Sequence, residues 1–262
     1  MRNNGRVGFS LVELSIVLVI LGLLVGGVLS GQSLIKAAEL RAATSEFTRY
    51  YVATQTFRDK YFALPGDMPN ATAFWGASAP QVTCRALVST TAATCNGDGN
   101  GQIVSQGNSN EQFSFWKHLS NAGLIEGSYT GVGAANGVEN LRADKTNAPV
   151  SKLSNLIWNM TYIGVFSSGA AFNLDYGNSF ILGGPIPAGT NSWLNASSYA
   201  INPSDAWNID TKVDDGKPAI GKVIGTYNSS ICTTATSPND YAGDYRFTNT
   251  GNVCALFMRQ SF

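Results

Sequence analysis

The feature that most constrains this chain is an uncharged, apolar run near its N-terminus. Between Leu14 and Ile35 there is no Asp, Glu, Lys or Arg, and most residues are Ile, Leu, Val or Gly. As a helix the run measures about 33 Å at about 1.5 Å per residue, which is enough to cross a hydrocarbon layer of about 30 Å. The sequence therefore predicts a transmembrane segment at about residues 14–35.

Charged residues flank this run asymmetrically. Arg2 and Arg6 precede it, and Glu13 stands at its start. Basic residues favour the cytoplasmic side of a membrane segment. A carboxylate costs up to about 2.5–3.5 kcal/mol at the centre of a membrane helix and less near the interface. The retention of Glu13 at this position therefore indicates a functional role.

Three kinds of N-terminal segment share such a run: a secretory signal peptide, a plain membrane anchor and a prepilin-type signal. A secretory signal is cut after the apolar stretch at small residues of the A-x-A type. Ser30 and Gly31 are small but form no such site, and the helical pattern continues beyond them. A plain anchor gives no reason for Glu13, although a chance motif before an ordinary anchor remains the alternative.

The segment from Gly8 to Leu14, GFSLVEL, resembles the signal of type IV pilins and type II secretion pseudopilins. The match comprises a short basic leader, glycine before the cut, phenylalanine after it and glutamate five residues into the mature chain. The resemblance implies that a prepilin peptidase removes residues 1–8 and N-methylates Phe9. It also implies that Glu13 of an incoming subunit pairs with the Phe9 amine of a neighbour during assembly.

The same resemblance implies a location and partners. The precursor would be a single-pass protein of the bacterial inner membrane with its head in the periplasm, and would later join a pilus or pseudopilus. Its partners would be further copies of itself, other pilins, the prepilin peptidase, the inner-membrane assembly platform and membrane lipid. The alternative is a minor pilin or tip adhesin whose enlarged head binds a surface, a glycan or a secreted substrate. Trp75, Trp193 and Trp207 would stack on sugars if exposed, but each is expected in the core.

The predicted fold class is α+β, with a long N-terminal helix packed on an antiparallel sheet. Residues 1–8 form the leader, residues 9–62 the helix and residues 63–262 the globular head. No proline interrupts the helix before Pro65, so a break is expected near residues 62–65. An aromatic stripe in the second half of the helix is expected to face the sheet. It comprises Phe47, Tyr50, Tyr51, Thr54, Phe57 and Tyr61.

Within the head, apolar spacing predicts an amphipathic helix over Glu111–Ile125 that ends near Gly123. After Asn155 the sequence changes to short β-rich runs separated by Gly, Asn or Pro, which indicates an antiparallel meander. The expected strands are Ile157–Phe166, Ala171–Leu182, Ala219–Tyr227, Tyr241–Phe247 and Val253–Met258.

The four cysteines form two locally spaced pairs. No CxxC occurs, and the lone His118 is distant in sequence from all four, which disfavours a zinc site. Outside the cytoplasm two disulfides are expected, Cys84–Cys95 and Cys232–Cys254, because these close the shortest loops. Four cysteines permit two other connectivities as well.

Two acidic, glycine-rich loops suggest calcium. Asn96, Asp98 and Asn100 alternate like the first half of an EF-hand loop, but position twelve is Gly107, and Glu111 is the nearest closing ligand. A plain turn explains the same dipeptides equally well. The segment Asn208–Gly216, with Asp210, Asp214 and Asp215, is a weaker match. Pseudopilins bind calcium in their heads, so the resemblance makes these loops relevant.

The sequence argues against catalysis and nucleic-acid binding. It has one histidine and contains no GxSxG, P-loop or HExxH motif. Seventeen basic residues balance seventeen acidic ones, so no net field attracts a polyanion. We therefore expect neither an enzyme nor a nucleic-acid partner.

Overall fold

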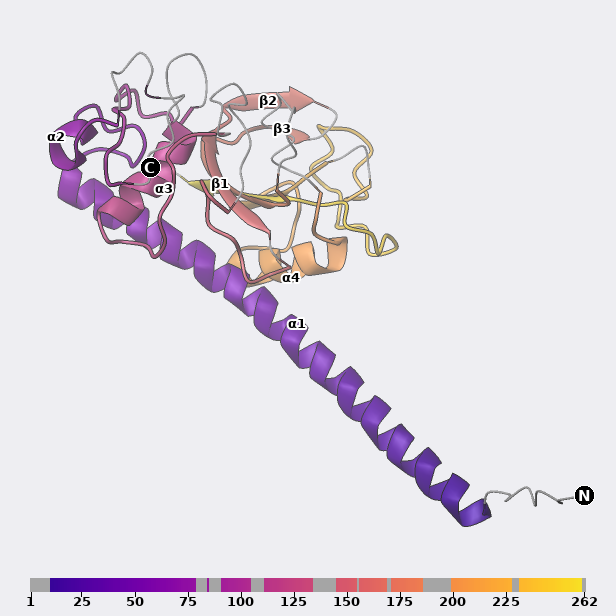
Figure 1. The fold of residues 1–262 in the computed structure, drawn as a ribbon. Coiled ribbons are helices and arrows are strands. Elements are labelled where there is room, and N and C mark those ends of the chain that lie inside the picture. The colour runs from indigo at the N-terminus through magenta and orange to yellow at the C-terminus, as the bar shows by residue number, and fades with distance from the viewer. Residues whose placement is uncertain are drawn as a thin grey trace, which may run out of the picture. The chain divides into compact units, whose positions relative to one another are not determined.

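The computed structural model describes residues 10–78, 84, 91–104, 111–133, 145–154, 156–168, 171–185, 199–227 and 231–260. The fold is α+β, as predicted, with a long apolar N-terminal helix and a four-stranded antiparallel sheet (Figure 1). The chain divides into two compact units, Met1–Glu39 and Leu40–Phe262. Each is described by itself, and the second is called the head unit.

Helix α1 spans Leu11–Tyr61 without interruption, as the absence of proline predicts. It ends where Phe62 adopts φ 54°, in the left-handed region, while the Phe62 N–H still bonds the Arg58 carbonyl oxygen at 2.8 Å. Helices often end on a left-handed residue, but glycine or asparagine is usual there. A bulky side chain in this conformation costs about 1–2 kcal/mol. Phe62 is therefore a strained helix end.

The main sheet has four antiparallel strands in the order β1-β4-β6-β5. They are β1 (Ile157–Tyr162), β4 (Asn178–Gly183), β6 (Leu256–Gln260) and β5 (Val223–Gly225). The chain between β1 and β4 forms a separate hairpin of β2 (Val165–Ser168) and β3 (Ala171–Asp175). The predicted meander is therefore wrong, because β1, β4 and β6 are neighbours in space but not in sequence.

Two other predictions about local structure are wrong. The sequence predicts a strand over Tyr241–Phe247, but this stretch is turns with an isolated bridge from Tyr245 to Thr233. The sequence does not predict helix α4 (Pro203–Val213), which covers part of the weaker calcium loop. Asn202 caps α4 by accepting the Asp205 N–H at 2.8 Å, and proline occupies the first turn, where its missing N–H is harmless.

The remaining helices are short. Helix α2 spans Ala71–Trp75 and helix α3 spans Glu111–Asn121. Helix α3 begins where predicted, and Gly123 at φ 71° follows its end, as a glycine C-terminal signal predicts.

Both faces of the main sheet are buried, in two separate cores. Phe180 and Leu182 of β4 pack in the core that contains residues of α1 and α3, whereas Ile181 packs with the β3 residue Phe172. This alternation is the period of two that a strand imposes. The α1 residues buried in the first core are Leu40, Ala43, Tyr50, Ala53 and Phe57.

Phe47 and Tyr50 of the aromatic stripe on α1 face the sheet as predicted, whereas Phe57 lies beside Trp75 of α2 and His118 of α3, each at 6.3 Å between ring centroids. The Tyr50 ring lies 5.7 Å from the Trp158 ring of β1 and 5.1 Å from the Trp116 ring of α3, centroid to centroid. Phe47 also stacks on Trp158, at 6.4 Å. Tyr51, by contrast, is 39% exposed, because it lies 100° around the helix from Tyr50.

Glu46 anchors α1 to the segment before β1. Its Oε2 accepts hydrogen bonds from Ser151 Oγ at 2.6 Å and Trp158 Nε1 at 2.9 Å, and its Oε1 accepts the Lys152 N–H at 3.0 Å. The side chain is 8% exposed. A buried carboxylate is tolerated when several donors satisfy it, so Glu46 fixes the position of α1 along the sheet.

Two disulfides stabilise the head unit, Cys84–Cys95 and Cys232–Cys254. These are the two expected pairs. The paired cysteines are 11 and 22 residues apart in sequence, and closing each loop lowers the chain entropy of the unfolded state.

We predict that Glu46→Ala destabilises the full chain in detergent by about 2–4 kcal/mol, because two buried donors, Ser151 Oγ and Trp158 Nε1, lose their acceptor. Urea unfolding followed by tryptophan fluorescence measures the change. Asp59→Ala on the exposed side of the same helix is the matched control and should change stability by less than about 0.5 kcal/mol. Equal effects of the two substitutions would contradict the anchoring role.

Candidate functional site

The apolar part of α1 keeps its side chains exposed in the unit Met1–Glu39. From Leu11 to Ile35 every large apolar side chain is between 51 and 87% exposed. An 18-residue window has a mean hydropathy of 2.6, with 0% of that window buried. The helix is therefore long and apolar enough to cross a membrane, a property it shares with signal sequences near an N-terminus.

Two of the serines within this apolar surface, Ser15 and Ser33, satisfy their hydroxyl groups inside the helix. Ser15 Oγ donates to the Val12 carbonyl oxygen and Ser33 Oγ to the Ser30 carbonyl oxygen, each at 2.9 Å. A hydroxyl that is already bonded to its own helix leaves no free donor to the lipid. These serines are therefore compatible with a hydrocarbon environment.

Ser10 and Glu13 form a capping box at the start of α1. Ser10 Oγ accepts the Val12 N–H at 3.2 Å, and Glu13 Oε2 accepts the Ser10 N–H at 2.8 Å. The box satisfies N–H groups that lack partners in the first helical turn. Glu13 thus has a local role in addition to the one expected in assembly. Gly8 and Phe9, the expected processing residues, lie outside the described residues.

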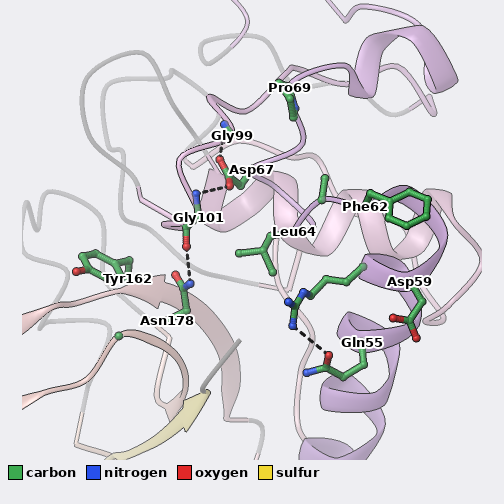
Figure 2. Close-up of a pocket in the computed structure, with 13 residues that line it drawn as sticks. Gln55, Asp59, Phe62, Leu64, Asp67, Pro69, Gly99, Gly101, Tyr162 and Asn178 are labelled. Atoms are coloured by element: carbon green, nitrogen blue, oxygen red, sulfur yellow. Dashed lines mark hydrogen bonds between the residues drawn. The ribbon is translucent and has the colours of Figure 1, made fainter.

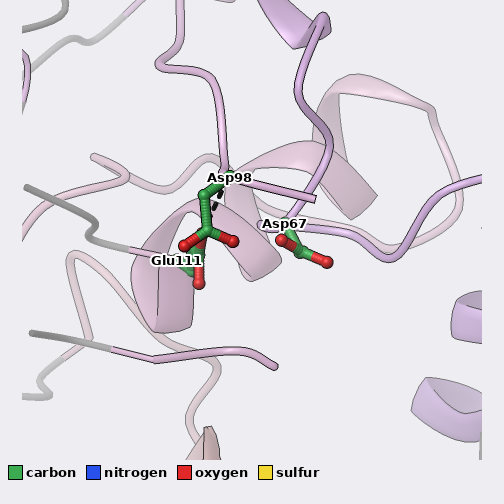
Figure 3. Close-up of side chains that lie close together, drawn as sticks. All are labelled: Asp67, Asp98 and Glu111. Carbon is green, nitrogen blue, oxygen red and sulfur yellow. Dashed lines mark hydrogen bonds between the residues drawn. The ribbon is translucent and has the colours of Figure 1, made fainter. Parts of the chain in front are cut away.

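In the head unit three carboxylates meet beside the first turn of α3 (Figure 3). Atoms of Asp67, Asp98 and Glu111 lie within 4.8 Å of one another. Asp67 and Glu111 are buried, at 3% and 1% exposure, whereas Asp98 is exposed. The sequence suggested Asp98 and Glu111 but missed Asp67, because the turn Pro65–Pro69 shows no periodicity that would reveal which way its acid points.

Asp67 and Glu111 organise the loop between them through backbone N–H groups. Asp67 Oδ1 accepts from Gly99 at 2.6 Å and from Asn100 at 3.1 Å, and Oδ2 accepts from Gly101 at 2.8 Å. Glu111 accepts from the Asp98 and Val104 N–H groups, both at 3.0 Å. These bonds replace the ladder hydrogen bonds that an irregular loop cannot make.

Asn96 and Asn100 bond within the loop structure. Asn96 Oδ1 accepts the Thr72 N–H at 2.8 Å. Asn100 Oδ1 accepts the Gln102 N–H at 2.7 Å, and its Nδ2 donates to Asp98 Oδ2 at 2.9 Å. The alternating oxygens that suggested an EF-hand thus shape the turn, and a cation would have Asp67, Asp98 and Glu111 as its carboxylate ligands.

The acids of this cluster have raised pKa values, because they are buried and lie close to one another. Burial and, less strongly, the negative charges of Asp98 and Asp67 together raise the pKa of Glu111 to about 7, against the two backbone hydrogen bonds that lower it. Burial also raises the pKa of Asp67 above its usual range. A divalent cation would relieve both effects, because it favours the ionised carboxylates.

His118 and two glycines allow the segments that carry the three acids to lie close together. His118 Nδ1 accepts the Gly66 N–H at 2.9 Å, and burial lowers the pKa of the imidazole to about 3, so the ring is neutral. A Cβ on Gly66 would lie 2.3 Å from the Glu111 carbonyl oxygen, and one on Gly97 would overlap the Asp67 backbone. His118 is therefore a packed structural residue, as expected for a lone histidine.

A second acidic cluster lies at the C-terminal end of α4 and comprises Asp210 of the helix with Asp214 and Asp215, which follow it. Asp210 is fully buried and accepts hydrogen bonds from Tyr245 Oη at 2.8 Å and the Gly216 N–H at 3.2 Å. Burial, with smaller contributions from the charges of Asp215 and Asp214, raises the pKa of Asp210 to about 7 despite its two hydrogen bonds. The cluster closes the end of α4, which is the structural use of the weaker calcium loop.

An open groove of about 930 Å³ runs beside the C-terminal end of α1. Figure 2 shows Gln55 and Asp59 of α1 on one side and Tyr162 and Asn178 of the sheet on the other. The other lining residues are Arg58, Phe62, Ala63, Leu64, Asp67, Pro69, Gly99, Gly101 and Gly177. The carboxylate cluster thus contributes one member, Asp67, to the groove wall.

Two of the three tryptophans suggested for glycan stacking, Trp75 and Trp207, lie in the described residues. Trp207 is 39% exposed and packs edge-on against Phe247 at 5.7 Å, so the expectation that it is core is wrong. Trp75 is half-buried and packs 5.4 Å from the His118 ring. Trp193 lies outside the described residues.

Comparison with protein-family models, with curated protein sequences and with solved structures finds no match. Function must therefore be argued from the residues themselves.

We predict that the contribution of Asp210 to head stability falls as pH rises from about 4 to about 7, against a contribution of opposite sign from His118, whose folded pKa is about 3. Asp210 has an ordinary pKa of 3.8 and a folded pKa of about 7, so between these values the folded state binds more protons than the unfolded state. Asp210→Asn removes this ionisation while keeping an acceptor for Gly216 and a polar partner for Tyr245. Its stability relative to the unsubstituted chain should therefore increase with pH in urea unfolding of the full chain in detergent.

Glu111 contributes a slope of the same sign, so the difference between the two proteins is the diagnostic quantity. A difference that stayed constant from pH 4 to 7 would contradict the raised pKa of Asp210.

Proposed function

We propose that this chain is a structural subunit of a filament of the type IV pilus or type II secretion class. It is inserted in the inner membrane by α1, processed after Gly8 and assembled through the same helix. The observation that carries the proposal is that two features occur together in the N-terminal segment. The prepilin-like motif Gly8–Leu14 opens directly into an apolar surface that remains exposed to Ile35.

The apolar surface of α1 supports both stages of this function. In the precursor it suits lipid, which has no polar groups to bond the backbone. In a filament the same side chains would be buried by the helices of neighbouring copies, because apolar area is removed from water at about 25 cal/mol per Å². One surface therefore serves as an anchor and then as an interface.

The charge at the start of α1 supports an assembly role for Glu13. Cutting after Gly8 creates an ammonium group at Phe9, next to the positive end of the helix dipole, where a cation is unfavourable. Glu13 follows four residues later and already accepts a hydrogen bond from Ser10 N–H. A carboxylate from a neighbouring copy would neutralise the new amine and fix the axial position of the two subunits.

The head unit suits a compartment outside the cytoplasm. Its two disulfides form and persist in an oxidising environment such as the periplasm. Its low content of charged residues, 13%, also suits packing among other heads. These features support a periplasmic head that later lies on a pilus or pseudopilus surface.

We predict that Glu13→Ala and Glu13→Gln are both processed to an N-terminal methyl-Phe9 and that both lose most of their filaments. Glutamine can keep the capping box with Ser10, since S-x-x-Q caps as S-x-x-E does, but it has no charge for the neighbour's amine. Mass spectrometry of the mature N-terminus and electron microscopy of sheared filaments in the native host measure the two steps.

Gly8→Val is the control for processing and should leave an unshifted precursor. Normal filaments from Glu13→Gln would show that capping, and not charge pairing, is what Glu13 supplies. A mature N-terminus other than Phe9 would refute the proposed function.

We also propose that the head unit takes calcium at Asp67, Asp98 and Glu111. The donors are hard oxygens, which calcium prefers, and Asp67 Oδ2 and both Glu111 oxygens each accept one backbone N–H, which leaves a second lone pair on each. Calcium would supply the positive charge that the three acids lack among themselves, holding the loop 97–104 to α3. The support is the geometry of the cluster, with Asp67 in place of the asparagines suggested by sequence.

We predict that millimolar calcium raises the melting temperature of the full chain in detergent by several degrees, as binding to the folded state requires. Glu111→Gln and Asp67→Asn should abolish the shift, whereas Asp240→Asn, an acid of neither cluster, should retain it. An equal shift in all four proteins would show binding elsewhere, and an absent shift in the unsubstituted chain would exclude the site.

A further inference from the structure

The sequence contains the acceptor motif of N-linked glycosylation, an Asn-X-Ser/Thr triplet in which X is not proline. Such triplets begin at Asn70, Asn159, Asn195 and Asn228. Asn195 and Asn228 lie outside the described residues. In a chain rich in Asn, Ser and Thr some triplets arise by chance, so the surroundings of each asparagine decide whether it can be an acceptor.

The side chain of Asn159 is not accessible in the folded head. Asn159 lies in β1, where it pairs with Ile181 of β4, and it is 3% exposed. Its Oδ1 also accepts the Met160 N–H at 2.9 Å. A buried amide in a paired strand cannot reach the active site of a transferase, so Asn159 is not an acceptor.

Asn70, by contrast, is exposed, and its side chain bonds no other described residue. It stands at the N-cap position of α2, where an asparagine side chain usually accepts an N–H group of the first helical turn. Here the Thr72 N–H bonds Asn96 Oδ1 at 2.8 Å instead. Asn96 therefore caps the helix in place of Asn70. The Asn70 amide is left without a structural role, unlike that of Asn202, which caps α4.

The residues that follow Asn70 also suit an acceptor. Thr72, whose hydroxyl group completes the motif, is half-buried, and this hydroxyl bonds none of the described residues. Phe74 lies about one helical turn beyond Asn70 and is 55% exposed. Sugar rings have apolar C–H faces that can stack on such an aromatic ring. A glycan on Asn70 would thus have an exposed apolar surface beside it to cover.

We propose that Asn70 carries an N-linked glycan. In the transfer, Asn70 Nδ2 attacks the anomeric carbon of an oligosaccharide that is linked to a polyprenyl diphosphate. The C–N bond forms as the bond from this carbon to the diphosphate oxygen breaks. The Nδ2 proton passes to a base of the transferase, and polyprenyl diphosphate leaves. No oxidant or reductant is required.

The inference rests on the proposed location of the head outside the cytoplasm, because the oligosaccharide is transferred on that side of the membrane. The two disulfides of the head unit support this location. The glycan itself is an addition to the proposed filament function, since processing after Gly8 and assembly through α1 do not require it.

Mass spectrometry of the mature full chain from its native host tests the site. Trypsin releases residues 61–85 as one peptide, which contains Asn70 as its only asparagine. After reduction of the disulfide, we expect electron-transfer fragmentation of this peptide to place a sugar mass on Asn70. Asn159 should be unmodified in the same sample.

Two substitutions of Thr72 separate glycosylation from structure. Thr72→Val keeps the shape of the side chain and leaves Asn70 in place but removes the hydroxyl group, so the sugar mass should be lost completely. Thr72→Ser keeps the motif and should retain the sugar. Asn252→Gln, at an exposed asparagine outside any triplet, is the control and should also retain it.

An unmodified peptide 61–85 from a chain that begins at Phe9 and has both disulfides would overturn the inference and leave the proposed function in place. A sugar on a serine or threonine of this peptide, or a sugar retained in Thr72→Val, would overturn it as well. Reduced cysteines in the same sample would refute the location on which both proposals rest.

Discussion

The structure depends on the change in character along one continuous helix. Up to Ile35 the helix α1 is apolar on all sides, and from Leu40 it is apolar on one face only. A helix that is apolar all round needs lipid or other helices, whereas one with a single apolar face needs a core. Leu40, Ala43, Tyr50 and Phe57 supply that face for the sheet. The boundary between the two compact units, at Glu39 and Leu40, falls where this change occurs.

Buried carboxylates recur throughout the head unit as acceptors for backbone N–H groups. Glu46, Asp67, Glu111 and Asp210 are each nearly or fully buried, and each accepts backbone N–H groups from a segment without regular structure. A chain rich in Gly, Asn, Ser and Thr forms few long strands, so its loops need other acceptors for their N–H groups. Each carboxylate oxygen can accept two hydrogen bonds, which makes one acid able to hold several residues.

The long helix, the fold class and the disulfide pairs could be predicted from the sequence because each rests on local information. An uncharged run, an absence of proline and short cysteine spacings need no knowledge of distant contacts. The sheet order could not be predicted, since β1, β4 and β6 pair across intervening segments of the chain. The residues 241–247 carry aromatic residues typical of a strand, but Tyr245 is held by the buried Asp210 instead.

The candidate sites show the same division. Asp98 and Glu111 could be identified from the sequence. Asp98 belongs to a glycine-rich segment in which oxygen-bearing side chains alternate, and Glu111 is the nearest acid after it that could close a calcium loop. Asp67 could not be identified in this way, because its direction depends on the N–H groups of Gly99 and Gly101, more than thirty residues away. Helix α4 was detectable in principle from Asn202 and Pro203, a capping residue followed by a proline. The acidic residues at its end resemble a calcium loop, so the segment was interpreted as a loop and not as a helix.

The two ends of α1 present complementary problems. At its start, Glu13 carries a charge that lipid disfavours, and the capping box reduces this penalty without removing it. At its end, Phe62 exposes an apolar ring that water disfavours, on a backbone that resists it. In the proposed assembly the Phe9 amine of a neighbouring copy would be the counterion of Glu13 and would remove the first of these penalties. The same helix would then be held in lipid by its apolar surface and in a filament by this charge pair as well.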